Sequence, residues 1–432
     1  MQNEFPSKIP LTGSDYFHLF LDQHARKNPG SGNIGRLAVK VEGAIQATTI
    51  TEKLKSDAFL RWTGSLFVKK GFLFATPFWV VKKETHIRFQ EFFISEKDNL
   101  PDEILVRNIS PETPPLINLD LIHNKEGTST IILSWHHALM DAHGAETFLK
   151  VLGEQISNPD LKNLLPRHEK DKKLLELLIS AKKAKRFVVE ETPKKIAALT
   201  SFNLLKNAKA KYKTIEFDEA ETTKIESRTK ELGLRFGLSP LYLGATCRTL
   251  YSILKKRNNF KGDLWVPVPQ DHRLKGNYGP VITNQISFLF YKLSEKELTT
   301  LKTTIDAISS QMIFLIKEGV TKNYVDMMNL FKRIPLSIYS RMVKGPTKGL
   351  LSTFFFSDTG DSLRDFNTFL NLPILDATHF PPTVYPPGFT VVFMKFKGKL
   401  KLIIGYTDAN FSEEEIGLIT STIKTELFES FA

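Results

Sequence analysis

The segment IILSWHHALMDAHG, residues 131–144, constrains the fold of this chain more than any other stretch. Its first seven residues alternate as in a β-strand, so every second side chain faces the same way. One face carries Ile131, Leu133, Trp135 and His137, and the other carries Ile132, Ser134 and His136. His137 is thus expected to end an apolar, inward-facing row, and a helix is expected from about Gly144 to Ile156.

An imidazole at the end of such a row lies between a core and a cavity. Low dielectric there keeps a histidine neutral at pH 7, as a general base requires. Asp141, in the turn before the helix, either orients this imidazole or holds the loop by pairing with a cation elsewhere. Gly144 permits a tight helix entry or a close approach of backbone. A structural, hydrogen-bonded histidine is the simpler alternative.

A metal site is the chemical rival to a general base. Histidine and carboxylate side chains that can bind zinc or iron gather in a short span. They are His123, His136, His137, Asp141 and His143. Neighbouring histidines on a strand diverge, however, so we expect no metal.

Length and composition restrict the class of protein. The 432 residues favour two or three domains, and the lone Cys247 suits a reducing compartment, so we expect a cytoplasmic protein. We find no apolar run of about 18 residues, so no transmembrane segment is expected, although peripheral membrane contact stays open. The net charge of +12 favours anionic partners, among them an acidic acyl carrier protein. Nucleic acid is not expected, because no RRM, KH or zinc-finger signature is present.

Strand and helix patterns alternate along the chain. Strands are predicted at 35–45, 114–123, 128–137, 211–218, 262–272, 283–293, 350–360, 390–397 and 399–407. Helices are predicted at 47–67, 222–258 with a break near 233–240, 295–319, 324–343 and 411–431, the last opening on a Ser-x-x-Glu capping box. The Lys-rich stretch at 162–213 is predicted to be a solvated helical connector or a docking surface.

The motif HHALMDAHG matches the HHxxxDxxG signature, and the chain therefore resembles a known superfamily of acyltransferases. That superfamily includes chloramphenicol acetyltransferase, nonribosomal-peptide condensation domains, wax-ester/diacylglycerol acyltransferases and the plant acyl-CoA-dependent enzymes. Weaker matches follow in the right order, at VPVPQDHRLKGNYGPVITNQISFLF, STFFFSDTG and the C-terminal hairpin and helix. The D-F-G-W-G segment of the plant enzymes is absent, which argues against that branch.

The resemblance implies an α+β fold of two similar chloramphenicol-acetyltransferase-like α/β sandwich domains, arranged in a V with a tunnel between them. Residues 1–160 would form the N-terminal domain, 161–211 the connector and 212–432 the C-terminal domain. The resemblance makes His137 the general base, His136 a supporting residue and Gly144 the residue that keeps the motif loop clear. Asp141 would pair with an arginine, for which Arg273 is the candidate and Arg257 an alternative.

The implied activity is transfer of an acyl group from a thioester to a hydroxyl or amine. No permanently bound cofactor is expected, because acyl-CoA or acyl-phosphopantetheine would be the donor substrate and a small molecule or lipid the acceptor, in secondary or lipid metabolism. Asn284, Ser357 and Thr359 are candidate oxyanion or substrate-binding residues, and Asp358 weakens such donation if its carboxylate faces the site. A free-standing condensation enzyme and a noncatalytic binding relative are the alternatives.

Overall fold

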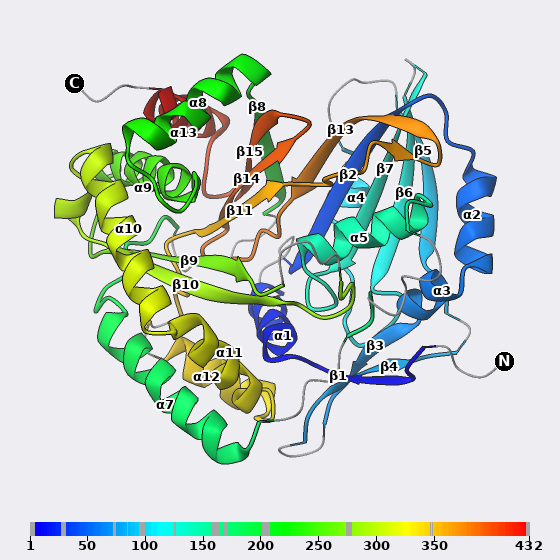
Figure 1. The fold of residues 1–432 in the computed structure, drawn as a ribbon, viewed down its shortest axis with the longest axis horizontal. Coiled ribbons are helices and arrows are strands. Elements are labelled where there is room, and N and C mark those ends of the chain that lie inside the picture. The colour runs from blue at the N-terminus through cyan, green and yellow to red at the C-terminus, as the bar shows by residue number, and fades with distance from the viewer. Residues whose placement is uncertain are drawn as a thin grey trace.

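The computed structural model describes residues 5–26, 32–71, 75–83, 85–94, 100–124, 127–156, 164–166, 172–200, 208–273, 279–345, 347 and 349–428. Helices and sheets are mixed along the whole chain, as the sequence predicts (Figure 1). The V-shaped pairing of two similar domains, with a tunnel between them, stays a prediction. No helix among the described residues is long and apolar enough to cross a membrane.

The largest sheet has six strands in the order β12-β13-β2-β7-β6-β5. These strands are β2 (Ile34–Glu42), β5 (Arg88–Ile94), β6 (Ile117–Asn124), β7 (Thr128–His136), β12 (Thr368–Phe369) and β13 (Leu372–Phe380). The antiparallel pair β6 and β7 confirms the predicted strands, and Gly127 before β7 has φ 71°. β7 ends at His136, so the two histidines lie where the sequence predicts.

Strand β13 reaches this sheet from the far end of the chain. It pairs antiparallel with β2, and His379 lies opposite Leu37. The sequence pattern predicts no strand at 372–380, because the alternation there is weak and the pairing partner is remote. The six-stranded sheet therefore combines residues from both halves of the chain.

A second sheet has four strands in the order β11-β14-β15-β8. They are β8 (Ala210–Glu216), β11 (Phe355–Asp361), β14 (Phe389–Phe396) and β15 (Lys399–Thr407). The predicted hairpin between β14 and β15 is confirmed, with Lys397 at φ 47° and Gly398 at φ 80° in its turn. Helices α8 (Glu219–Glu231), α9 (Ser239–Lys256) and α13 (Glu413–Phe428) gather beside this sheet (Figure 1).

Two smaller sheets make up the rest of the β-structure in the part of the chain that the structure describes. One pairs β9 (Leu264–Asp271) with β10 (Ile286–Leu293), and the other contains β1 (Lys8–Pro10), β4 (Phe78–Val81) and β3 (Leu66–Lys69). The remaining helices among the described residues are α1 (Gly13–Ala25), α2 (Ala47–Ser56), α3 (Ala58–Gly64), α4 (Asp102–Leu105), α5 (Ala142–Leu152), α7 (Leu174–Glu191), η2 (Glu295–Leu298), α10 (Leu301–Lys317), α11 (Val320–Phe331) and α12 (Leu336–Lys344). Helix α7, within the predicted connector, packs along α11.

Three predicted helix details are wrong. The helix predicted at 47–67 is split at Asp57, which is extended at φ −72°, ψ 123° and whose side chain caps α3 by accepting from the Leu60 amide. The helix predicted at 324–343 is split before Pro335, which precedes α12. At α13, Ser412 Oγ accepts from the Glu415 amide at 3.1 Å, but the Glu415 carboxylate is found bound to Arg257 and not to the Ser412 amide, so only half of the predicted capping box is present.

Candidate active site

The turn that follows β7 is held by backbone and side-chain hydrogen bonds from two sides. The His137 amide donates to the Asn33 carbonyl at 2.9 Å. From the other side, Asn284 Nδ2 donates to the carbonyls of His137 and Ala138, each at 3.0 Å. Since Asn33 precedes β2 and Asn284 precedes β10, residues remote in sequence fix the position of the histidine pair.

His136 points away from the pocket. Its side chain is fully buried, and Nε2 lies 3.4 Å from Asp22 Oδ2 on α1. Its Nδ1 accepts from the Ala138 amide at 3.2 Å. His136 is therefore placed to support the turn and not to reach a substrate.

His137 lines a pocket and keeps only part of its surface accessible. Burial of the rest of the ring lowers its pKa below the usual 6.5, so the imidazole is neutral at pH 7 and one of its two ring nitrogens is unprotonated. Asp141 does not orient this ring, because its carboxylate is bound elsewhere. The arrangement supplies a neutral base at the wall of a cavity.

Asp141 is the N-cap of α5 and the centre of a buried ion pair. Arg273 Nη1 donates to Asp141 Oδ2 and Nη2 to Oδ1, both at 2.9 Å. The amides of Gln285 and Gly144 also donate to the carboxylate, each at 2.9 Å. Burial alone would raise the pKa of Asp141, but the Arg273 charge and these hydrogen bonds lower it below 3.8. Arg257, the alternative partner, binds Glu415 instead.

Gly144 lies where the start of α5 touches the backbone before β10. A Cβ at this position would stand 2.4 Å from the Val281 carbonyl oxygen and 3.0 Å from Met140 Cβ. Only a residue without a side chain permits this approach.

Asn284, predicted from the sequence as a candidate oxyanion donor, is bound to other groups of the protein. Besides its two bonds to the motif turn, its Nδ2 lies 3.0 Å from Asp15 Oδ1, and its backbone amide donates to the same oxygen at 2.7 Å. Three acceptors compete for two amide hydrogens, which leaves none for a substrate. Asp15 itself is buried, and burial raises its pKa to about 6.

The pocket is mainly apolar and draws its walls from both halves of the chain. Its lining comprises His18, Leu21, Asn33, Gly35, Trp135, His137, Ala142, Pro267, Pro269, Ile286, Phe288, Phe355, Phe356, Ser357, Thr359, His379, Phe380, Pro381, Pro382, Val384, Thr390 and Val392. Among these described lining residues, histidine is the only type with an ionisable side chain.

Ser357 and Thr359 on β11 both reach the pocket wall. Thr359 Oγ1 lies 3.0 Å from Ser362 Oγ and 3.4 Å from the Phe393 carbonyl, so it is partly engaged. The intervening Asp358 is outside the lining, and its Oδ1 accepts from the Gly360 amide at 3.0 Å. Its carboxylate therefore does not face the site.

The sequence analysis missed two histidines of the lining. His18 on α1 stacks on His137, with ring centroids 4.1 Å apart and planes inclined by 9°. His379 on β13 donates from Nε2 to Glu146 Oε1 on α5 at 2.9 Å. The capping pattern Thr12-x-x-Asp15 could have predicted α1, but no local pattern connects either histidine to residue 137.

The residues considered for a metal are dispersed. His136 faces Asp22, His123 faces Glu91 at 3.1 Å, and His143 faces Glu146 at 3.4 Å. Within the described ranges, no group of three or more histidine, cysteine or acidic side chains is arranged to hold an ion.

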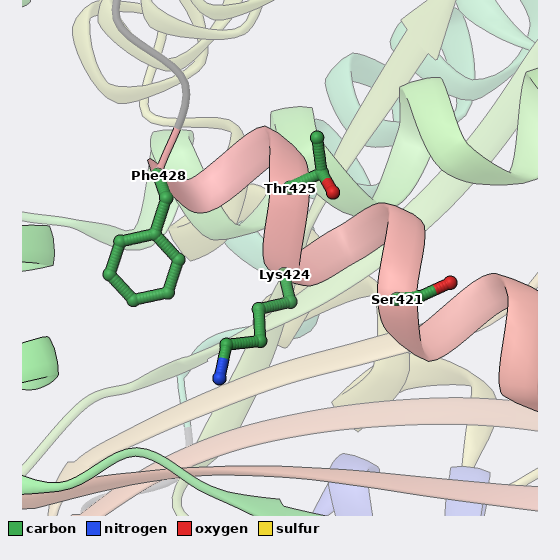
Figure 2. A pocket seen from close by; sticks show the side chains of 4 residues that line it. All are labelled: Ser421, Lys424, Thr425 and Phe428. Atoms are coloured by element: carbon green, nitrogen blue, oxygen red, sulfur yellow. The ribbon is translucent and has the colours of Figure 1, made fainter.

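A second hollow lies on α13 and carries no comparable chemistry. Figure 2 shows its four side chains, Ser421, Lys424, Thr425 and Phe428. Lys424 Nζ is bound to Glu221 Oε1 at 2.7 Å, and Phe428 supplies an apolar wall. A general base is absent from these four residues.

Solved structures share the whole architecture. Trichothecene 15-O-acetyltransferase from Fusarium sporotrichioides matches with a TM-score of 0.68 and 13% identity, over 98% of this chain and 95% of that one. The first condensation domain of the CDA synthetase matches with a TM-score of 0.66 and 11% identity, over 97% and 95%. The starter condensation domain of rhizomide synthetase, solved with C8-CoA and Leu-SNAC, matches with a TM-score of 0.64 and 12% identity, over 98% and 94%.

This chain has the fold of those acyltransferase and condensation domains. The resemblance inferred from the HHxxxDxxG motif is thereby confirmed at the level of fold. No protein-family profile and no curated protein sequence matches the chain.

Proposed function

We propose that this protein is an acyltransferase that moves an acyl group from a thioester to a hydroxyl or amine, with His137 as general base. The observation that carries the proposal is the position of His137, a neutral imidazole on a fixed turn at the wall of an apolar pocket. The fold it shares with an acetyltransferase and with condensation domains supports the same class of reaction.

The chemistry follows from these parts. The acceptor oxygen or nitrogen attacks the thioester carbonyl while His137 takes its proton, a contribution typically worth about 10² to 10⁴ in rate. The carbonyl electron pair moves onto oxygen and returns as the C–S bond breaks, and His137 then protonates the thiolate. Asp141 and Arg273 act at a distance from the reaction by fixing the turn that carries the imidazole.

The donor is proposed to be acyl-CoA or an acyl-phosphopantetheine on an acidic carrier protein, and the acceptor a small molecule or lipid. The aromatic and aliphatic lining suits an apolar acyl chain. No resident cofactor enters this chemistry, because the thioester itself is the activated substrate.

Release of free CoA tests the proposal. Purified protein is incubated with acetyl-, octanoyl- or palmitoyl-CoA and a panel of alcohols and amines, and thiol release is followed beside product mass. Wild type should turn over and His137→Ala should lose at least about 10²-fold. His123→Ala is the matched control, because His123 pairs with Glu91 and is not among the pocket-lining residues. Equal turnover in wild type and His137→Ala would defeat the proposed role of His137, whereas no turnover in wild type would favour a noncatalytic binding relative.

A free-standing condensation enzyme is the second candidate, favoured by the condensation-domain matches. It would form an amide from carrier-bound aminoacyl groups. Amide formation with an aminoacyl carrier protein, without turnover of free CoA thioesters, would select this candidate.

A further inference from the structure

Ser357 is one candidate donor at the pocket wall for the oxygen of a reacting carbonyl. Negative charge on that oxygen requires a fixed donor, and loss of one such donor costs about 10² to 10³ in rate in other enzymes. Asn284 has no hydrogen to spare, and Thr359 is partly engaged with Ser362. A second donor would be a polar hydrogen of the pocket lining that has no partner within the protein.

His18 provides such a hydrogen. Asn33 Nδ2 donates to the His18 carbonyl at 2.8 Å and lies 3.1 Å from His18 Nδ1. The bond to the carbonyl fixes which end of the amide is NH₂, so His18 Nδ1 faces a donor and must be the unprotonated nitrogen. The proton of neutral His18 is then on Nε2.

The Nε2–H group of His18 is buried and has no hydrogen-bond partner among the described residues. A buried donor left unpaired is destabilising, and such groups in native proteins call for an explanation. His18 is a pocket-lining residue, and its ring stacks on His137 at 4.1 Å. The unpaired donor therefore belongs to a ring in contact with the general base.

We propose that His18 is a second catalytic residue, whose Nε2–H donates a hydrogen bond to the thioester carbonyl oxygen as it becomes an oxyanion. This inference rests on the proposed acyl transfer. The proton stays on His18 throughout, because His137 takes the acceptor's proton and delivers it to the leaving thiolate. A neutral imidazole serves this role in other enzymes when its surroundings keep it uncharged.

The surroundings of His18 meet that condition. Burial lowers the pKa of His18 well below 6.5, and the neighbouring His137 and His136 lower it further. A second proton on His18 would also have to displace the hydrogen that Asn33 donates to Nδ1. His18 is thus held as a donor from Nε2 and disfavoured as a base.

Three variants at residue 18 separate a donor from a packing residue. His18→Phe keeps an aromatic ring against His137 and removes the Nε2–H donor. His18→Asn also removes this donor, and its side chain is too short to reach the position of Nε2. His18→Gln places an amide NH₂ near the position of Nε2. His123→Phe, outside the pocket lining, controls for the loss of an imidazole.

With the acyl-CoA and acceptor found for wild type, kcat of His18→Phe and His18→Asn should fall about 10²-fold with KM changed less than about threefold. His18→Gln should recover at least about tenfold of that loss. Melting temperatures establish that each variant is folded, and if His18→Phe does not fold, the Asn and Gln pair decides. Unchanged kcat in folded Phe or Asn variants, or equal loss in Asn and Gln, overturns the inference.

The outcomes also separate this inference from the proposed function. If wild type shows no turnover that depends on His137, both fall together. If wild type is active, ¹⁵N spectra of its histidine rings provide an independent measurement, with the His18 signal assigned from His18→Phe. A proton on Nε2 is expected, and a proton on Nδ1 would overturn the role of His18 while leaving acyl transfer intact.

Discussion

Arg273 and Asp141 form a buried, two-pronged ion pair that joins the end of β9 to the start of α5, with both N–O distances at 2.9 Å. The side chains are 4% and 5% exposed, so neither charge can be satisfied by water if its partner is lost.

Arg273→Ala is therefore expected to destabilise the protein by about 3–5 kcal/mol, the usual cost of an uncompensated buried charge. Urea unfolding measures this loss. Arg273→Lys should recover little, because an ammonium group cannot reproduce the planar fork. Arg257→Ala is a matched control for activity, since Arg257 binds Glu415 away from the pocket. If Arg273→Ala matched wild type in both urea unfolding and turnover, the Arg273–Asp141 pair would have no role in holding the turn.

Substitution of Gly144 tests the close approach of α5 to the Val281 carbonyl. Gly144→Ala would place a methyl group 2.4 Å from that oxygen, and we expect a loss of about 1–3 kcal/mol together with reduced turnover. Gly417→Ala, at an exposed position of α13, meets nothing within 4 Å and should stabilise the helix by about 0.5–1 kcal/mol. Thermal unfolding compares the two, and a neutral Gly144→Ala would contradict the packing described.

The pH dependence of kcat/KM tests His137 as the base. The deprotonated imidazole is the active form, and burial lowers its pKa below 6.5. Activity should therefore be constant through pH 7 and fall on acidification with a midpoint below 6.5. A midpoint above 6.5 would show that the base is a different group or an imidazole in polar surroundings.

Glu146→Gln tests the cluster behind His379. The hydrogen bond to Glu146 raises the pKa of His143 to about 9, while burial opposes this shift. The stabilisation from this ionised pair is fully present below about pH 6.5 and is lost as pH rises through 9. The difference in melting temperature between wild type and Glu146→Gln should thus be larger at pH 6 than at pH 10. A constant difference would mean that the carboxylate acts through His379 alone.

Local patterns predict much of this fold. Alternation identified the strands around residue 131, and the turn pair Lys397 and Gly398 identified the last hairpin, because both signals come from neighbouring residues. The position of His137 just after β7 is likewise predicted by the alternation of this strand, while its role as a base stays a prediction. The tight turn between α2 and α3 was missed, since Asp57 ends one helix and caps the next within a continuous helical pattern.

Non-local placement explains most of the errors at the site. The Asn284 side chain was predicted to face the substrate. Its amide NH₂ group instead binds Asp15, 269 positions earlier in the chain, and the carbonyls of the motif turn. His18 and His379 contribute to the pocket through packing of α1 and through the pairing of β13 with β2. No local sequence pattern predicts these contacts, because they join segments that meet only in the folded chain.

The pairing of β13 with β2 also constrains how the protein is made. On the ribosome, residues 34–42 emerge early, yet the strand that covers their open edge is translated more than 300 positions later. Until then that edge presents unpaired amides and carbonyls, the kind of template on which nascent polypeptides associate wrongly. Completion of the first-formed sheet is therefore a late step of synthesis, and a nascent chain stalled near residue 212 would leave this edge open.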